Sequence, residues 1–384
     1  MSALSQRLQA PARERVVKNP QPWYTPRFWH GMRASTWVKQ LAANRFAVSP
    51  SRWGLALTVS GVSAVNSALA AIDDAMNGRR VAKVELAEPP LFILGHWRAG
   101  TTLLHELLIR DPRHTYPSTY QCFVPHHFLV SQSLLAPLTS VLLPKRRPMD
   151  NMVAGWERPQ EDEFALENMG VPTPYLSMMF PNRGPVHDDY LTLHDLPPAA
   201  RQRWCDELVR FFRRVALHDN RRIVVKSPGH TARVAVLAEL FPGARFVHIA
   251  REPCALYASS VALWRSLNAL QSMQAIGDET WIEAHVRASL KRMYEAYFAD
   301  RNALAPNQLV ELRYEDLVAH PKAGIKTVYE QLELGDFDAA EPNIDAHLAE
   351  VKNYRPNLRA TDEALAADLR EEWGDYFREF GYDR

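Results

Sequence analysis

Four short apolar runs alternate with longer segments of helical periodicity along the chain. The runs are LFILG at Leu91–Gly95, IVVK at Ile223–Lys226, FVHI at Phe246–Ile249 and QLVEL at Gln308–Leu312. Apolar runs of this length are typical of strands that are buried on both faces. Because strands that alternate with helices form parallel sheets, the pattern predicts an α/β fold with a central parallel sheet flanked by helices.

An amphipathic helix is predicted over Ala199–His218, because large apolar side chains recur there on one helix face. These side chains are Trp204, Leu208, Phe211, Phe212 and Val215. A further helical stretch is expected over 231–241, between the second and third strands. Two more are expected over 253–267 and 278–300, between the third and fourth strands. Such helices can return the chain to the same edge of the sheet.

The same patterns divide the chain into a main domain and an N-terminal extension. Residues 1–88 are predicted to be helical and irregular, and they end at a Glu-Pro-Pro turn. Residues 89–384 form the main domain, and its last part, 336–384, is a helical tail. Residues 113–198 are rich in Pro, His, Met and aromatic residues and lack sustained periodicity, which is typical of a lid or a binding insertion.

Charge is distributed unevenly between the extension and the rest of the chain. Residues 1–52 hold nine basic residues and one acid, Glu14, so they carry +8 and the remainder carries −7. Six aromatic residues accompany this charge. Our interpretation is an arm that packs its aromatic side chains on an acidic main domain. The alternative is peripheral contact with a membrane through residues 1–53. No nucleic-acid motif is present, so no nucleic-acid partner is expected.

Targeting and redox signals indicate a cytoplasmic protein. The first residues lack the apolar segment of a secretory signal. The most apolar stretch, Leu55–Ile72, contains five Thr, Ser or Asn residues, so a packed helix is expected and no membrane-spanning segment is predicted. The three cysteines, Cys122, Cys205 and Cys254, form no CxxC pair, which argues against a disulfide framework and against a Cys-rich zinc site.

The loop after the first strand has the pattern of a phosphate-binding loop. Gly95 and Gly100 are separated by four residues between a strand and a helix, and Thr101 and Thr102 follow. Backbone N–H groups at a helix start attract an anion, and glycine lets the backbone approach it. A nucleotide triphosphatase has Lys directly after the second glycine. This chain has Thr101 there and its cation, Arg98, inside the loop, which disfavours Mg²⁺-dependent hydrolysis.

The segment PLFILGHWRAGTTLLHELL resembles the first signature of the sulfotransferases that use 3′-phosphoadenosine-5′-phosphosulfate (PAPS). That family often has Ser where this chain has Ala99. The resemblance implies that Arg98, Ala99, Gly100, Thr101 and Thr102 bind the 5′-phosphosulfate. It further implies a P-loop NTPase-like fold, PAPS as donor, adenosine 3′,5′-bisphosphate (PAP) as product, and no metal requirement.

Two later motifs are similar to those of the same family. Arg251 ends the third strand and is followed by Pro253 and, eight residues after the Arg, by Ser259. A guanidinium beside a hydroxyl matches phosphate geometry, and the resemblance assigns this pair to the 3′-phosphate. After the fourth strand, Tyr314 stands in a Tyr-Glu-Asp run, which in cytosolic members of the family contacts adenine.

Sulfuryl transfer requires a base for the acceptor proton and cations for the developing charge. The segment that follows the second strand holds Lys226 and His230, and cytosolic relatives have a Lys and a His in this place. His230 is the predicted base, although it lies two residues later than in the family. The rival is Glu163 or a neighbour in the acid cluster 161–163, which could equally stabilise a helix start.

The acceptor is expected to bind in the insertion. Phe123–Leu143 and Tyr175–Phe180 are apolar, which suits a hydrophobic or lipid-like acceptor and equally suits core packing. The sequence therefore predicts a sulfotransferase that transfers to a hydroxyl or amine. The alternative functions are a nucleotide-dependent small-molecule kinase and a non-catalytic nucleotide-binding protein attached to a membrane.

Overall fold

A five-stranded parallel sheet forms the centre of the molecule. The structure is a computed structural model that describes residues 24–144, 153–350 and 363–383. The strand order is β2-β3-β1-β4-β5, and all neighbours are parallel. The strands are β1 (Leu91–Leu94), β2 (His114–Thr115), β3 (Arg222–Lys226), β4 (Arg245–Ala250) and β5 (Leu309–Arg313).

The predicted α/β class and its four strands are confirmed. The strand β2 was not predicted, because two residues give no readable pattern. The central strand β1 pairs with β3 and with β4, so that Ile93 lies opposite Lys226 on one side and Val247 on the other. Because all strands run the same way, the loops that follow β1, β3, β4 and β5 meet at one edge of the sheet, which is where ligands bind in such folds.

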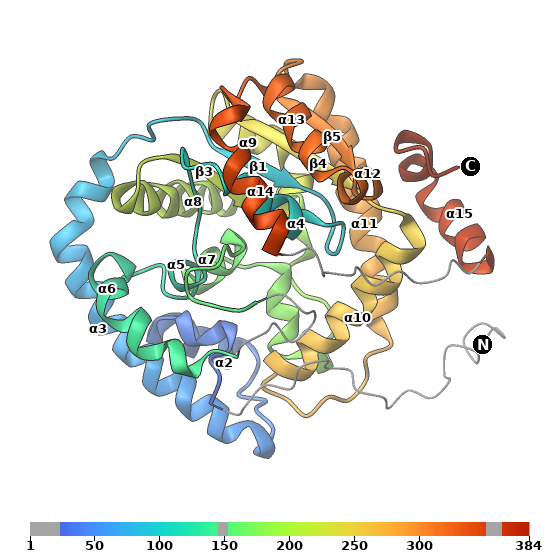
Figure 1. The fold of residues 1–384 in the computed structure, drawn as a ribbon. Helices are drawn as coiled ribbons and strands as arrows, with labels where there is room; N and C mark the ends of the chain where they lie inside the picture. The colour runs from blue at the N-terminus through green and yellow to red at the C-terminus, as the bar shows by residue number, and fades with distance from the viewer. Residues whose placement is uncertain (1–23, 145–152, 351–362, 384) are drawn as a thin grey trace.

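Helices cover both faces of the sheet (Figure 1). The predicted amphipathic helix is α8 (Pro198–His218), and all five of its predicted apolar side chains are buried. The helix α10 (Pro253–Gln271) begins at Pro253, as expected, and the Glu252 side chain caps its first N–H groups. Outside the region 113–198, the other helices after β1 are α4 (Thr101–Leu108), α9 (Val234–Leu240), α11 (Trp281–Asp300), α12 (Tyr314–Ala319), α13 (Pro321–Leu332), α14 (Glu341–Glu350) and α15 (Glu363–Glu379).

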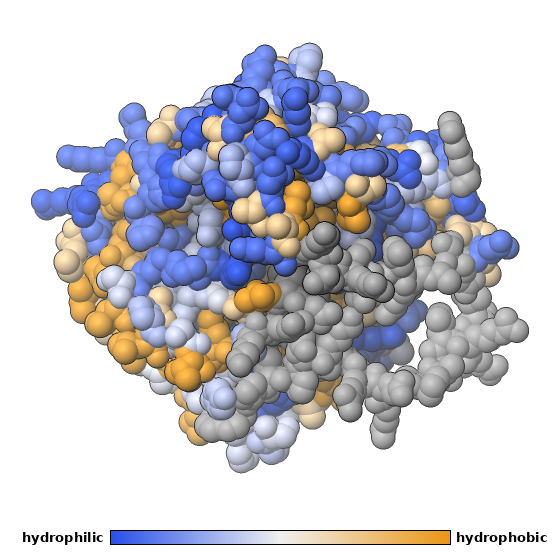
Figure 2. Space-filling model, in the orientation of Figure 1, coloured by the Kyte–Doolittle hydropathy of each residue, from blue (hydrophilic) through white to orange (hydrophobic). Residues whose placement is uncertain are grey.

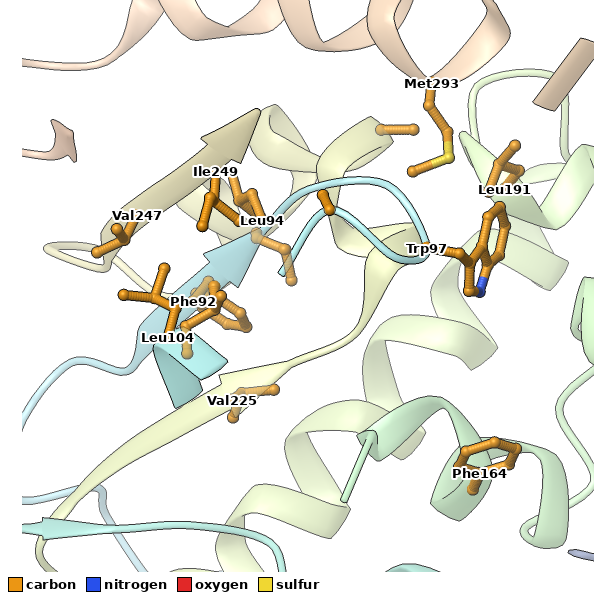
Figure 3. Packing of buried hydrophobic residues seen from close by; sticks show 14 of the residues in the cluster. Phe92, Leu94, Trp97, Leu104, Phe164, Leu191, Val225, Val247, Ile249 and Met293 are labelled. Atoms are coloured by element: carbon orange, nitrogen blue, oxygen red, sulfur yellow. The ribbon is translucent and has the colours of Figure 1, made fainter. Parts of the chain in front are cut away.

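The core is built on β1, whose four residues have no exposed surface. The ring of Phe92 stacks against Phe246 at 5.6 Å and against Phe212 at 6.1 Å between centroids. Figure 3 shows Phe92 and Val225 among the strand side chains, while Trp97 is carried beyond β1 on the loop. The sheet therefore fixes the start of the loop, and the loop reaches out of the core.

The region 113–198 is a set of short helices packed on the main core. They are α5 (Thr119–Phe123), α6 (Phe128–Thr139), α7 (Asp162–Asn168) and the 3₁₀ turns η3 (Ser140–Leu142), η4 (Pro174–Met178), η5 (Pro181–Arg183) and η6 (Asp188–Leu191). The predicted apolar segment Tyr175–Phe180 is buried throughout. Core packing thus accounts for most of this segment's composition, although Tyr175 also borders a pocket.

The N-terminal region is helical, with η1 (Phe28–Gly31), α2 (Ala34–Ala43), η2 (Pro50–Arg52) and α3 (Trp53–Lys83). Trp29 and Trp37 are buried in the main core, as the packing interpretation expects. The indole of Trp29 donates to the carbonyl of Gln271 at 2.5 Å. Phe46 is 63% exposed. Residues 1–23 of the predicted basic arm lie outside the described residues.

The stretch predicted to be a packed helix is only partly packed. Leu55–Ile72 lies within α3, and buried positions on this helix follow a single narrow stripe. Within the described residues, Pro50–Lys83 is one stretch with the length and apolar composition that a membrane span would need. Length and composition alone do not distinguish a span from a surface helix, so the contacts of α3 decide how it is used.

Candidate active site

The loop between β1 and α4 is held in a conformation that requires glycine. Gly100 has a φ of 108°, in the left-handed region. A Cβ atom at this position would lie 2.3 Å from the Cδ2 atom of Tyr314. The first N–H groups of α4, beginning at Thr101, have no acceptor within their own helix. The loop can therefore present these donors to an anion.

The predicted donor-site residues come together on this loop. The Nε atom of Arg98 donates to the Oγ atom of Ser259 at 3.0 Å. The Nη1 atom of Arg251 donates to the carbonyl oxygen of Arg98 at 2.8 Å. Arg98 and Ser259 are partly exposed, whereas Arg251 is 8% exposed. Two segments that are distant in the sequence, the loop and residues 251–259, thus place two guanidinium groups and a hydroxyl within one site.

Tyr314 lies beneath the loop. The guanidinium carbon of Arg251 is 4.5 Å from the centroid of its ring, a cation–π contact, and Gly100 packs against the ring edge. Tyr314 is 8% exposed. The ring supports the loop and Arg251 in this structure, and its contact with adenine stays a prediction.

A residue that was not predicted for the site, Tyr376 of α15, holds the backbone of Arg251. Its hydroxyl accepts from the N–H of Arg251 and donates to the carbonyl of the same residue, both at 2.9 Å. Burial raises the pKa of Tyr376, so the hydroxyl keeps its proton and can serve both roles. The only sequence signal was the group of aromatic residues in the helical tail.

Lys226 belongs to a buried polar chain next to the loop. Its Nζ atom forms an ion pair with the Oε1 atom of Glu161 at 2.5 Å. The Tyr175 hydroxyl donates to the other oxygen of Glu161, and the Trp97 indole donates to Tyr175 at 2.7 Å. Burial and the adjacent carboxylate raise the pKa of Tyr175. These contacts connect the end of β3 to Trp97 of the loop through the carboxylate of Glu161.

His230 lies in the core. Its Nε2 atom pairs with Asp162 at 2.8 Å, and its ring meets those of Phe92 and Trp204 edge to face. Burial acts to raise the pKa of Asp162, but His230 and a hydrogen bond from Ser227 hold that pKa below its usual value. The His230 side chain has no exposed surface. Its role as base stays a prediction.

Glu163 is occupied by a different partner. Arg233 donates to both of its oxygens, at 2.6 and 3.1 Å. Both side chains are buried, and the guanidinium lies over the ring of Trp204, 4.9 Å from its centroid. The acid cluster thus divides among three partners, Lys226, His230 and Arg233, and Glu161 alone of the three carboxylates lines the pocket beside the loop.

A partly open pocket adjoins the loop. It has a cavity volume of about 130 Å³, comparable to a cavity that holds one aromatic ring. Thr102 of the loop lines it, together with Glu161. Most of its other side chains are apolar or aromatic, including Phe28, Trp97, Phe123, Leu143, Val153, Phe164, Tyr175 and Leu263. His230, Glu163 and Lys226 are not among the lining residues.

No group of three or more His, Cys, Asp or Glu side chains that could hold a metal ion occurs within residues 24–144, 153–350 and 363–383. His126 and His127 are adjacent in the sequence but contact different partners, the carbonyl of Asn168 and the hydroxyl of Ser131. The arrangement offers cations and N–H donors for anions, two pocket carboxylates, Glu106 and Glu161, and largely apolar walls.

Comparison with known proteins identifies the family. The model of the sulfotransferase family matches residues 89–338. The chain is 39% identical over 362 residues to omega-hydroxy-beta-dihydromenaquinone-9 sulfotransferase Stf3 of Mycobacterium bovis and of Mycobacterium tuberculosis, covering 94% of this chain and 92% of the relative.

Two solved structures share the fold at 19% identity. Sulfotransferase STF9 from Mycobacterium avium has a TM-score of 0.66 over 91% of this chain and 96% of that chain. Sulfotransferase STF1 from Mycobacterium tuberculosis has a TM-score of 0.60 over 83% and 88%. The match over most of the chain and the shared P-loop-like fold lead to one conclusion: this chain is a sulfotransferase and belongs to the sulfotransferase family.

Proposed function

We propose that this enzyme transfers the sulfuryl group of PAPS to a hydroxyl group of a lipid-like acceptor and releases PAP. The observation that carries the proposal is the convergence of Arg98, Arg251 and Ser259 beside an apolar pocket that contains Glu161. The name of the 39% identical relative supports the acceptor class, because that protein acts on a hydroxylated menaquinone-type lipid.

The loop and its partners are suited to the donor. Arg98 and the N–H groups that begin α4 would stabilise charge on the transferring group and on the 5′-phosphate. A guanidinium has five N–H donors, so the bond from Arg251 to the Arg98 carbonyl leaves others for a 3′-phosphate. Ser259 adds a hydroxyl. Tyr314 and Tyr376 keep Arg251 and the loop in place.

We infer that Glu161 is the base. It is the carboxylate of the acid cluster that lines the pocket, and its two oxygens are held by Lys226 and Tyr175. Glu106 also lines the pocket, but it forms an ion pair with Arg110 at 2.5 Å. In the reaction an acceptor O–H gives its proton to Glu161 while the acceptor oxygen forms a bond to sulfur. The bond from sulfur to the 5′-phosphate oxygen breaks, and PAP leaves with the electron pair. Lys226 contributes positive charge near this site.

The pocket walls suit the end of a lipid better than a free sugar. Aromatic side chains form a stack of Phe28, Phe164 and Tyr175, with centroids 4.2 and 5.0 Å apart along it. Such walls bind apolar groups by removing them from water. A hydroxyl at the end of an apolar chain would approach Glu161 and Thr102 while its carbon atoms contact the rings.

The direct test is an assay of the full chain with PAPS and two acceptors, a hydroxylated menaquinone-type lipid in detergent and a soluble phenol. We expect a sulfated lipid by mass spectrometry and release of PAP, without added Mg²⁺. Transfer to the phenol alone would remove the lipid proposal. A product that forms only with ATP and Mg²⁺ would identify a kinase, and nucleotide binding without any product would identify a binding protein.

A second experiment tests the base. Glu161→Gln should lose about 10²–10⁴-fold in transfer rate, the usual contribution of a positioned base, while PAP affinity changes little. Glu163→Gln is the matched control from the same cluster, and it should lower thermal stability through loss of its pair with Arg233 while the folded enzyme keeps its rate. If His230→Ala alone stops transfer and Glu161→Gln does not, His230 is the base.

We also propose that the enzyme is cytoplasmic. Cys122 and Cys205 are buried free cysteines, as is typical of a reducing compartment. Peripheral contact with a membrane through residues 1–53 stays a prediction. Fractionation of cells that express the full chain would show whether the enzyme is free, membrane-bound or divided between the two.

A further inference from the structure

The long helix α3 has the reverse of the polarity expected for a surface helix. Its buried stripe contains four polar residues among seven, namely Val59, Ser63, Asn66, Ala70, Asp73, Asn77 and Val81. From Trp53 to Met76 its large exposed side chains are apolar, namely Trp53, Leu57, Val62, Val65, Ile72 and Met76. A helix on a water-exposed surface turns its polar face outward. The outer face of α3 therefore points to a surrounding other than water.

The inward polar side chains are fully used in contacts with the protein. The amide of Asn66 donates to the carbonyls of His30 and Met32 at 2.7 and 3.1 Å, and its oxygen accepts from His127 at 3.1 Å. Asp73 forms an ion pair with Arg214 at 2.7 Å, and both side chains are buried. These contacts fix the rotation of α3, so the apolar side is held outward.

The outward side carries a continuous apolar surface. From Gly61 to Met76, every exposed residue of α3 is Gly, Ala, Val, Ile or Met. Met76 is 66% exposed and Val65 56%. In Figure 2 hydrophobic residues form a band along the edge of the molecule over α3.

The neighbouring helix α6 extends this surface. It packs against α3, and the N–H of Val130 donates to Asp73 at 3.3 Å. The large exposed side chains of α6 and η3 are again apolar, namely Leu134 at 64%, Leu138 at 65% and Val141 at 78%, and Ser133 and Ser140 are exposed among them. We name these nine residues, Leu57, Val62, Val65, Ile72, Met76, Leu134, Leu138, Val141 and Trp53, the α3–α6 face.

Basic side chains stand at both ends of α3. Lys39 and Arg45 are exposed on the segment that leads into the helix, and Arg79, Arg80 and Lys83 are exposed in its last two turns. The nearest acid on the helix, Asp74, is engaged by Arg210 at 2.9 Å. An apolar strip with cations at its ends complements a bilayer that has anionic headgroups.

We propose that the α3–α6 face docks on an anionic lipid bilayer, with α3 lying in the plane of the membrane surface. The helix does not cross the bilayer in this arrangement, because its inner side is packed along its length by η1, α2, α6 and α8. A span would have to withdraw Asp73 and Asn66 from their partners and place them in hydrocarbon, which is costly.

The docked orientation connects the membrane to the pocket. Val141 of the face is separated by one residue from Leu143, and Leu143 and Pro144 line the pocket together with Val153, which is itself 56% exposed. Consecutive apolar residues, Val141 to Pro144, each at least partly exposed, thus connect the α3–α6 face to the pocket wall. A lipid acceptor could pass along these residues without entering water. This last step rests on the proposed function, whereas docking itself does not.

The test is sedimentation of the full chain with vesicles of phosphatidylglycerol and phosphatidylcholine. The double variant Val65→Glu, Ile72→Glu should bind about ten-fold or more weakly, because two exposed apolar contacts are replaced by charges that anionic lipid repels. Val318→Glu is the matched control, since Val318 is 38% exposed on α12, away from the face. It should bind as the unaltered chain does. Higher salt should weaken binding of the unaltered chain.

A fluorescent label distinguishes this face from the basic arm. A polarity-sensitive dye on Val65→Cys should shift to the blue and be quenched by brominated lipids, whereas the same dye on Val318→Cys should not. Equal sedimentation of the unaltered chain and the double Glu variant, or no quenching at residue 65, would overturn the proposal. So would a dimer that the Glu variant converts to a monomer without any vesicle binding.

Activity separates this proposal from the proposed function. The double Glu variant should sulfate a short, soluble hydroxylated acceptor at the rate of the unaltered chain and should lose activity only on lipid presented in vesicles. If the unaltered chain binds vesicles but sulfates no lipid, the acceptor class is wrong and docking stands. If it sulfates lipid in detergent but never binds vesicles, docking is wrong.

Discussion

The strand β1 and the buried stripe of α3 differ in the side chains that they bury. All four residues of β1 are apolar and have no exposed surface, and Arg98 and Arg251 meet beyond the ends of the strands. Along α3 the interior is polar, with Asp73 paired to Arg214, and the apolar groups face outward. The two regions share one continuous core but differ in what they expose.

This difference matches the two substrates that we propose. A nucleotide donor is charged and dissolved in water, so it needs cations and N–H groups on a rigid edge. A lipid acceptor lies in a membrane, so the enzyme needs an apolar surface that polar contacts hold in a fixed orientation. In this chain, the burial of apolar groups stabilises the sheet around β1, and buried polar contacts fix the orientation of α3.

The largest expected effect comes from breaking the buried ion pair between α3 and α8. Asp73→Ala leaves the Arg214 guanidinium, which is 1% exposed, without its close carboxylate. Removing one partner of a buried ion pair costs about 3–5 kcal/mol of unfolding free energy. Asp74→Ala is the matched control, because Asp74 is 41% exposed and its pair with Arg210 is worth at most about 1 kcal/mol. Urea unfolding measures both. Equal losses would mean that the inner pair does not hold α3.

The next largest effect comes from removing the cation of the donor-binding loop. Arg98→Ala should lower kcat by about 10²–10³-fold, the usual cost of losing a preorganised charge donor, with little change in melting temperature. Arg201→Ala, which removes a guanidinium exposed on α8, should leave kcat unchanged. An Arg98→Ala enzyme that keeps its full kcat would show that the loop cation does not act on the transferring group.

A smaller effect sharpens the assignment of the donor. Arg251→Ala should weaken PAP about ten- to a hundred-fold, because it removes a charged hydrogen bond to the 3′-phosphate. The affinity for adenosine 5′-phosphosulfate, which lacks that phosphate, should stay nearly constant. Calorimetric titration of both ligands measures the difference. If both ligands weaken alike, Arg251 acts by supporting Tyr314 and the loop.

The smallest effect concerns pH. Burial lowers the pKa of His127 from 6.5 to about 4, although the nearby Asp73 acts to raise it. The folded state therefore favours neutral His127. The contribution of this preference to the unfolding free energy is fully present above pH 6.5 and is lost as the pH falls towards 4. Lowering the pH from 7.5 to 5.5 should therefore reduce the unfolding free energy by about 1.4 kcal/mol through this histidine. His127→Gln should flatten the pH dependence by that amount, as measured by denaturant unfolding. An unchanged slope would assign the loss to other histidines.

The sequence predicted the sheet well because buried strands and loop motifs are local patterns. LFILG followed by two glycines is readable without any partner. The bond from Arg98 to Ser259 was not predicted, because Ser259 was assigned with Arg251 to the 3′-phosphate. Within the site, the resemblance to the family supplied the roles, and the structure supplied the contacts.

The remaining features depend on pairs of distant side chains. Nothing in the sequence shows that Glu161 pairs with Lys226 while Glu163 pairs with Arg233, because adjacent acids differ only in the direction each takes from the chain. The outward face of α3 was missed for another reason. An apolar, Ala-rich stretch suggests a packed helix, and only the contacts of Asn66 and Asp73 reveal that its polar side is inside.

The bond between Tyr376 and Arg251 has a consequence for how the enzyme is made. The loop, Arg251 and Tyr314 all leave the ribosome before α15 does, because the hydroxyl that fixes the Arg251 backbone lies 125 residues after Arg251 in the chain. N-terminal parts of a chain begin to fold during translation. The helices of the α3–α6 face can therefore form before the donor site is completed. With the docking that we propose, a nascent chain would reach a lipid surface before it could consume any donor.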